Sequence, residues 1–153
     1  MPDTNWKILS PLQMGRYAEY YAKMEFASYG CKVFTSEVDD HGVDFIVKGK
    51  NNLFYEIQVK SVRKTDYVFV KKTKFDFKNK SLYLALLLFK EDNLPDVYLI
   101  PSEAWKDPNQ MFVDRPYNKT GQTSQPEWGI NLSKKNHPIL EIFKLEEIIQ
   151  DFL

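Results

Sequence analysis

Four polar side chains have types and spacings that would let them do chemistry together: Glu19, Asp44, Gln58 and Lys60. Carboxylate and amide oxygens are the ligands that a hard divalent cation such as Mg²⁺ prefers. A lysine two residues after such a ligand would bring its ammonium group to the same place, where it could orient a water or stabilise developing negative charge. These residue types together therefore suit metal-assisted hydrolysis.

Gln58 and Lys60 must be positioned by a strand predicted over residues 53–63. Alternation along a strand places Glu56, Gln58 and Lys60 on one face and apolar residues on the other. A strand that buries one face has no packing reason to carry three long polar side chains in register. A solvated sheet face is the plainer interpretation of this strand alone, so the neighbouring elements decide between the two.

Glu19 belongs to a helix that is predicted from Pro11 to about Gly30, with Ser10 as its N-cap. One apolar stripe of this helix should face the core; it consists of Leu12, Gly15, Ala18, Ala22, Phe26 and Tyr29. Glu19 falls within this stripe, where a carboxylate is costly to bury unless a partner or a metal satisfies it. A structural ion pair with a lysine is the alternative to a functional role.

Asp44 opens a strand predicted over residues 43–48, after a polar turn at residues 39–42. An aspartate at a strand end is commonly an ordinary turn residue. A functional role for Asp44 is therefore supported only by its position in the sequence between the helix of Glu19 and the strand of Gln58 and Lys60.

The order of these motifs resembles the PD-(D/E)XK nuclease superfamily, which has the restriction-endonuclease-like fold. In that pattern an Asp begins the second strand and an (Asp/Glu)-x-Lys lies in the third. Many members add a Glu on the first helix, and a subset has Gln-x-Lys. Residues 42–47 and 56–61 look like the two signature strands, and the resemblance covers about residues 11–89. It implies an active site made of Glu19, Asp44, Gln58 and Lys60.

The resemblance implies a metal-dependent DNA endonuclease, with Mg²⁺, or Mn²⁺ in its place, as the cofactor. Its metal ligands would be Asp44, Gln58, the Val59 carbonyl and Glu19. Gln58 stands where most of the superfamily has a carboxylate, so the site lacks one negative charge, which Glu19 could restore. A rival register, Glu56-x-Gln58, has no lysine at its end. The alternative function is a catalytically weak or inactive nuclease-fold protein that binds nucleic acid or a protein partner.

The basic residues are unevenly distributed, although the net charge of the chain is zero. Eight of them lie between residues 60 and 80, against two aspartates, with aromatic residues interspersed. Such a segment suits contacts with phosphates, and a solvated lysine-rich hairpin is the alternative. The residues predicted to bind nucleic acid are Arg63, Lys64, Lys71, Lys72 and Lys74.

The 153 residues are 43% hydrophobic, without repeats or low-complexity segments. This predicts one nuclease domain over residues 1–153, with a core at about 11–100 and a C-terminal elaboration at 101–153. The expected fold class is α/β, a mixed central sheet flanked by helices. The longest apolar run, residues 82–89, is too short for a membrane span, and the N-terminus lacks the features of a signal peptide. These features predict a cytoplasmic protein.

Further elements complete the predicted fold. A first strand at residues 31–38 should form an antiparallel meander with the two strands above, and residues 67–71 should extend the third strand. Strands at 81–89, 96–100 and 128–132 should follow, the last at an edge, with a short helix at 101–105, a loop at 108–125 and a helix at 138–153. The first helix has a second apolar face, which predicts either an internal cover, such as the C-terminal helix, or a homodimer; it consists of Tyr17, Tyr20, Tyr21 and Met24.

Overall fold

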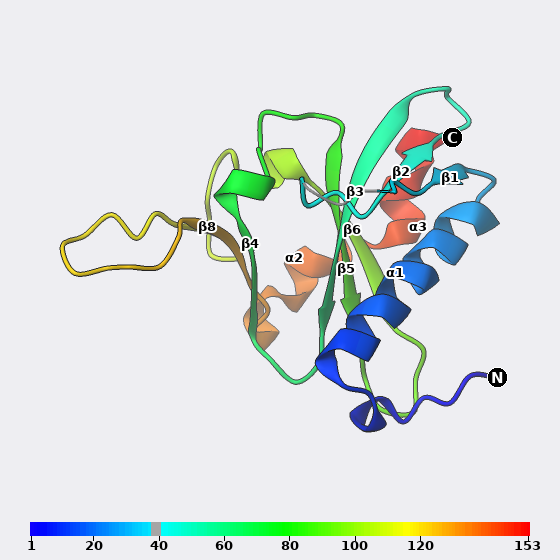
Figure 1. Ribbon diagram of the computed structural model, residues 1–153, viewed down its shortest axis with the longest axis horizontal. Coiled ribbons are helices and arrows are strands. Elements are labelled where there is room, and N and C mark those ends of the chain that lie inside the picture. The colour runs from blue at the N-terminus through cyan, green and yellow to red at the C-terminus, as the bar shows by residue number, and fades with distance from the viewer. Residues whose placement is uncertain (38–40) are drawn as a thin grey trace.

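A five-stranded mixed sheet forms the centre of the computed structural model, which describes residues 1–37 and 41–153 (Figure 1). Its strand order is β1–β2–β3–β5–β6, and the strands are β1 (Lys32–Phe34), β2 (Phe45–Lys48), β3 (Phe54–Val62), β5 (Leu82–Leu88) and β6 (Asp96–Pro101). β3 and β5 are parallel and the other neighbours are antiparallel. The predicted meander is therefore confirmed. Val38, the last residue of the predicted first strand, and residues 39–40 of the predicted turn lie outside the described residues.

A second, antiparallel sheet has the order β4–β8–β7. Its strands are β4 (Tyr67–Lys71), β7 (Phe112–Arg115) and β8 (Glu127–Asn131). The prediction that residues 67–71 extend the third strand is wrong, because β4 pairs with β8 instead. β8 is a middle strand rather than an edge strand, and β7 lies within the predicted loop. The partners of β4 are some 60 residues further along the chain, so no local signal in the sequence indicated this pairing.

The two faces of the central sheet are covered differently (Figure 1). On one face α1 (Pro11–Ser28), together with Phe152, packs on the apolar side chains of β2 and β3. On the other face the second sheet and α2 (His137–Glu141) pack on β5 and β6. The polar side chains of β3 project toward this second face, because they alternate with Tyr55 and Ile57 of the first.

α1 begins as predicted, with a capping box at Ser10. The Ser10 hydroxyl accepts a hydrogen bond from the Gln13 N–H (3.2 Å), and Gln13 Oε1 accepts one from the Ser10 N–H (2.9 Å). The buried stripe includes Met14, which lies four residues before Ala18. Leu12 is 83% exposed, so the predicted stripe is wrong at that residue.

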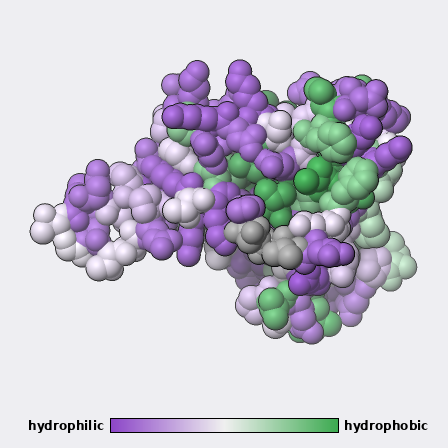
Figure 2. Space-filling view, turned by 45° about the horizontal axis from the view of Figure 1, so that its top comes forward, coloured by the Kyte–Doolittle hydropathy of each residue, from purple (hydrophilic) through white to green (hydrophobic). Residues whose placement is uncertain are grey.

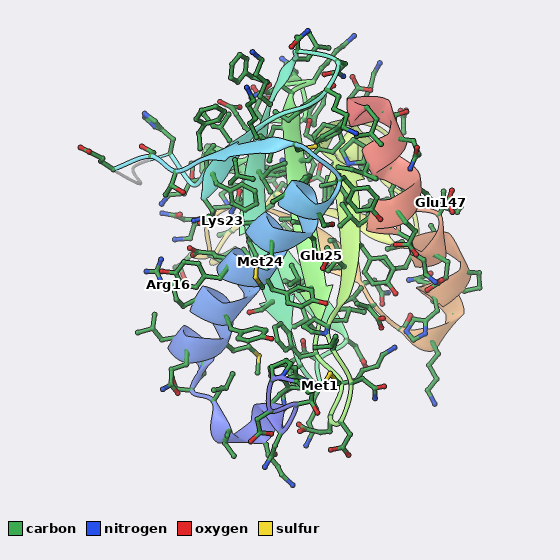
Figure 3. All side chains as sticks on the ribbon, turned by 90° about the vertical axis from the view of Figure 1, so that its right-hand side faces the viewer. Met1, Arg16, Lys23, Met24, Glu25 and Glu147 are labelled. Atoms are coloured by element: carbon green, nitrogen blue, oxygen red, sulfur yellow. The ribbon has the colours of Figure 1, made fainter. Side chains whose placement is uncertain are left out.

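The second apolar face of α1 is covered in part. Trp6 and Phe89 contact the Tyr17 ring, with centroids 5.0 Å and 6.1 Å away. The cover of Tyr17 is thus the N-terminal segment and the residue that follows β5. Tyr21 packs on the cluster that includes Leu145 and Ile149 of the C-terminal segment, so the predicted internal cover is present in part. Tyr20 and Met24 are 59% and 60% exposed, and Met24 lies on the outer side of α1 in Figure 3.

The predicted C-terminal helix is wrong as a single element. It consists of α2, α3 (Leu145–Ile148) and a 3-10 turn at Ile149–Phe152. The break has a physical cause: the chain at residues 143–144 pairs with β6, where the Leu99 N–H donates to the Phe143 carbonyl at 2.7 Å. Lys144 is therefore extended rather than helical.

The remaining helices are short 3-10 turns at Trp6–Ile8, Lys72–Lys74, Ser102–Trp105 and Lys134–Asn136. The third of these stands where a short helix was predicted. Across the residues that the structure describes, no helix combines the length and apolar character that spanning a membrane requires.

Candidate active site

The polar face of β3 borders a cavity of about 370 Å³ between the two sheets. One wall comes from the central sheet and the segment before β2; the other comes from β4 and the 3-10 turn that follows it. The lining residues are Gly42, Asp44, Gln58, Val59, Lys60, Phe69, Lys71 and Lys74. Three of the four predicted catalytic residues thus share one cavity with two of the predicted nucleic-acid-binding lysines.

The backbone of the neighbouring strand fixes Asp44 in place. Its N–H donates to the Ile57 carbonyl at 2.9 Å, and its Oδ2 accepts from the Val59 N–H at 2.6 Å. Because Phe45 pairs with Ile57 in the antiparallel register, Asp44 stands opposite Gln58. The β2–β3 hairpin therefore brings the carboxylate and the amide together.

Gln58 is the most unusual side chain of the site. It is 8% exposed, and its Oε1 has no hydrogen-bond partner among the described residues. A buried acceptor left without a donor costs about 1–3 kcal/mol, so it requires an explanation. An amide oxygen that faces a carboxylate across neighbouring strands fits a hard divalent cation as its missing partner.

Lys60 is held in an environment that disfavours its charge. Burial lowers the pKa of its ammonium group, and the positive charges of Lys71 and Lys74 lower that pKa further. Asp44 acts against this shift by raising the pKa of Lys60. A poorly solvated ammonium beside a carboxylate is suited to meet an anionic group of a substrate.

Glu19 is not among the described residues that line the cavity. Its carboxylate is paired with Arg16, which lies one turn earlier on α1 and is labelled in Figure 3 (Nη1 to Oε2, 3.0 Å). The partner is thus an arginine on the same helix, not a lysine. The roles of Glu19 in catalysis and metal binding stay predictions.

Acidic side chains are sparse around the cavity. Within residues 1–37 and 41–153, no three side chains of the His, Cys, Asp or Glu type are grouped so as to hold a metal ion. Glu56, which belongs to the rival register, accepts a hydrogen bond from Asn79 Nδ2 at 2.5 Å and is not among the lining residues. Oxygen ligands from the described residues would therefore be Asp44, Gln58 and the Val59 carbonyl.

Two lining residues were not predicted as part of the active site. Phe69 is one of the aromatic residues of the basic segment that were expected to support phosphate contacts, but its place in this cavity was not predicted, because β4 was expected to extend β3. Gly42 has a φ of +79°, and a Cβ at this position would lie 3.0 Å from the Lys74 Cβ. A glycine two residues before the candidate catalytic aspartate is the signal that could have indicated this close approach.

The predicted nucleic-acid-binding residues separate into two groups. Lys71 and Lys74 line the cavity. The other group is engaged or placed elsewhere: Lys72 pairs with Asp114 and lies 3.9 Å from the Trp128 ring centroid, and Arg63 pairs with Glu91 at 2.7 Å. Lys64, with a φ of +60°, is exposed between β3 and β4.

Neutralising Lys71 and Lys74 should weaken DNA binding and flatten its dependence on salt. Each lost phosphate contact reduces the slope of log K against log[salt] by about 0.9 for duplex DNA. The Lys71→Gln/Lys74→Gln variant should therefore show a slope smaller by about 2, as measured by fluorescence anisotropy at several salt concentrations. Lys72→Gln is the matched control, because Lys72 is already paired with Asp114; an equal effect of this control would contradict the assignment.

The sequence predicts a Mg²⁺ ligand at Gln58, so replacing Gln58 with glutamate should tighten Mg²⁺ binding, with the predicted cleavage retained or altered rather than lost. A further unit charge a few Å from the ion contributes at least about 1 kcal/mol, so the Kd should fall about fivefold or more. Calorimetric titration with Mg²⁺ measures this change. Glu56→Gln changes a charge on the same strand face outside the cavity and should leave the Kd unchanged.

Comparisons with known proteins agree with this architecture. No family model and no curated protein matches the sequence. The chain is similar in structure to Hjc, a Holliday junction resolvase from the archaeal hyperthermophile Archaeoglobus fulgidus, with a TM-score of 0.57 and 15% identity over 91% of this chain and 98% of that one. It is also similar to a bacterial homing endonuclease, I-Ssp6803I, with a TM-score of 0.55 and 17% identity over 93% of this chain and 94% of that one. The chain has the fold of these two neighbours, a mixed central sheet flanked by helices.

Proposed function

We propose that the protein is a metal-dependent DNA endonuclease that hydrolyses phosphodiester bonds, with Mg²⁺ or Mn²⁺ as its cofactor. The observation that carries the proposal is the buried, unpartnered Oε1 of Gln58 opposite Asp44, in a cavity that also contains Lys60. Most buried amide oxygens have a donor from the protein; Asn5 Oδ1 and Asn136 Oδ1 also lack one among the described residues, but of the three only Gln58 lines the cavity, opposite a carboxylate. Its place in the cavity beside Asp44 supports a cation as the missing partner of Gln58 Oε1.

Each residue of the site has a distinct part in this proposal. Asp44, Gln58 and the Val59 carbonyl would hold the cation, which would supply a nucleophilic water and neutralise charge on the phosphate. Lys60 would bind a phosphate oxygen or orient the water, since its ammonium is poorly solvated and seeks an anion. Lys71 and Lys74 on the opposite wall would hold the DNA backbone.

The second candidate is a catalytically weak or inactive nuclease-fold protein that binds nucleic acid or a protein partner. Its support is the low negative charge of the site, where the only acidic side chain among the described lining residues is Asp44. A cation held by one carboxylate and neutral oxygens binds more weakly than one held by two carboxylates.

The deciding experiment is incubation of the purified protein with supercoiled plasmid and Mg²⁺ or Mn²⁺, with and without a chelator. Conversion to nicked or linear plasmid that the chelator abolishes supports the endonuclease. If the protein binds DNA without metal and cleaves neither plasmid, duplex nor branched DNA, the second candidate, a DNA-binding protein without nuclease activity, replaces the endonuclease.

A homodimer is also proposed, since Tyr20 and Met24 leave an apolar area exposed on α1. Two copies would bring two sites to one DNA molecule. Sedimentation equilibrium tests this: wild type should have twice the chain mass, and Met24→Lys should have the chain mass.

A further inference from the structure

The sheet face that carries Gln58 and Lys60 continues toward β1 as an exposed aromatic surface. Phe34 on β1 and Phe54 on β3 are 47% and 56% exposed. Their ring centroids are 6.2 Å apart, with the rings tilted by 47°. Pairing partners share a face, and the pairs Phe34–Ile46 and Lys48–Phe54 put both rings on the face of Gln58. We call Phe34, Ile46 and Phe54 the aromatic surface.

Lysines accompany this surface. Lys48 Nζ lies 5.4 Å from the Phe54 ring centroid, and Lys32 is the partner of Lys48 on β1. The acidic residues on this face are Glu56, whose carboxylate accepts a hydrogen bond from Asn79, and Asp44 in the cavity; Lys32 and Lys48 are the charged residues nearest the rings. The surface therefore combines exposed rings with positive charge. The view of Figure 2, which brings forward the top of Figure 1, likewise shows hydrophobic atoms at the surface bordered by hydrophilic ones.

Charge decides what covers the rings. A second copy of the chain related by two-fold symmetry would bring the same lysines against one another, which costs free energy. A nucleic acid has the opposite charge on its phosphates, and the π-faces of unpaired bases stack on aromatic side chains. Bases inside an intact duplex are stacked on each other and cannot do this.

We propose that Phe34 and Phe54 bind unpaired nucleotides of a DNA strand whose backbone enters the cavity at Gln58 and Lys60. This substrate preference rests on the proposed nuclease function, and it specifies DNA with a single-stranded segment near the scissile phosphate. Phe54 precedes Gln58 by four strand residues, or about 13 Å at ~3.3 Å per residue. The unpaired bases therefore lie within a few nucleotides of the scissile phosphate.

The test compares a fluorescent single strand with a blunt duplex of the same sequence, both bound in EDTA so that no cleavage takes place. Phe34→Leu/Phe54→Leu keeps apolar side chains and removes the aromatic rings, and Phe34→Ala/Phe54→Ala removes both. Leu94→Ala is the control, because Leu94 is exposed on the β5–β6 turn, at the far end of the sheet from Phe54. Loss of stacking should weaken single-strand binding about fivefold or more. Duplex affinity and the salt slope should not change, because the phosphate contacts remain.

Three results would overturn the inference. In the first, the wild-type protein does not bind the single strand. In the second, the leucine variant binds the single strand as tightly as the wild-type protein. In the third, the leucine variant loses equal affinity for the single strand and for the duplex. A wild-type dimer that the leucine variant converts to a monomer would instead assign the rings to an interface between copies. Because the assay contains no metal, its outcome is separate from that of the plasmid test. If the protein cleaves no DNA but needs the two aromatic rings to bind the single strand, the proposed nuclease function is rejected and the proposed stacking surface is retained.

Discussion

Replacing Asp44 with asparagine is expected to reduce DNA cleavage by about a thousandfold or more. A catalytic cation contributes several kcal/mol of transition-state stabilisation, and each 1.36 kcal/mol is a factor of ten in rate. The asparagine side chain would keep an oxygen that can accept from the Val59 N–H, so the hydrogen bond to β3 survives while the charge is lost. Single-turnover cleavage at saturating DNA measures the effect.

Asp44→Ala separates the chemical role from the structural one. Alanine removes the charge and also leaves the Val59 N–H without its acceptor, which should lower the free energy of unfolding by about 1–3 kcal/mol. The asparagine variant should have nearly the wild-type stability in urea unfolding. Wild-type cleavage rates in the asparagine variant would show that Asp44 does not hold a catalytic ion.

Replacing Lys60 with methionine is expected to reduce cleavage by about a hundredfold or more, because a charge aimed at the transition state is lost. Metal affinity should stay close to that of wild type, since the proposed ligands Asp44, Gln58 and the Val59 carbonyl are untouched. A calorimetric Mg²⁺ titration beside the cleavage assay measures both quantities. A parallel loss of metal affinity and rate would mean that Lys60 acts through the ion site rather than on the substrate.

The stability of this variant has a predictable sign. Burial lowers the pKa of Lys60, so the folded state disfavours the charged form relative to the unfolded state. At neutral pH Lys60→Met should therefore unfold at a temperature no lower than that of wild type. If the variant loses activity but has an equal or higher melting temperature, the loss is caused by the missing ammonium group at the site and not by unfolding.

Local signals predicted much of the central sheet and its helix. Ser10, Pro11 and Gly30 indicated the limits of α1, and the helix has its N-cap at Ser10 and ends at Ser28, two residues before Gly30. The β2–β3 hairpin and the apolar run that became β5 follow from short turns and side-chain alternation. These features depend on residues close together in the sequence.

Elements that depend on distant partners were predicted less well. In the sequence, residues 67–71 resemble a continuation of β3, and only the structure shows that they pair with β8. Residues 138–153 have helical periodicity, yet the pairing of residues 143–144 with β6 interrupts the helix. The periodicity of apolar residues in the sequence indicates which face of a segment is buried. It does not indicate which backbone groups will form hydrogen bonds with a neighbouring strand.

The candidate site divides in the same way. Asp44, Gln58 and Lys60 could be placed together because strand register and alternation fix their face. Glu19 depended on the phase of a helix, where each residue turns the side chain by about 100°. The stripe extends through Met14, and Glu19 pairs with Arg16 outside the lining of the cavity.

The two walls of the cavity have separate supports, and this bears on how the protein could be altered. Asp44, Gln58 and Lys60 are held by pairing within the central sheet, whereas Phe69 and Lys71 are held by the pairing of β4 with β8. A library of substitutions restricted to β4 and its 3-10 turn would therefore vary the wall that carries Lys71 and Lys74 while leaving intact the strand pairing that holds the proposed catalytic residues. If the protein is the proposed nuclease, the same separation would let substitutions in one wall change the DNA target while the proposed catalytic residues stay in place.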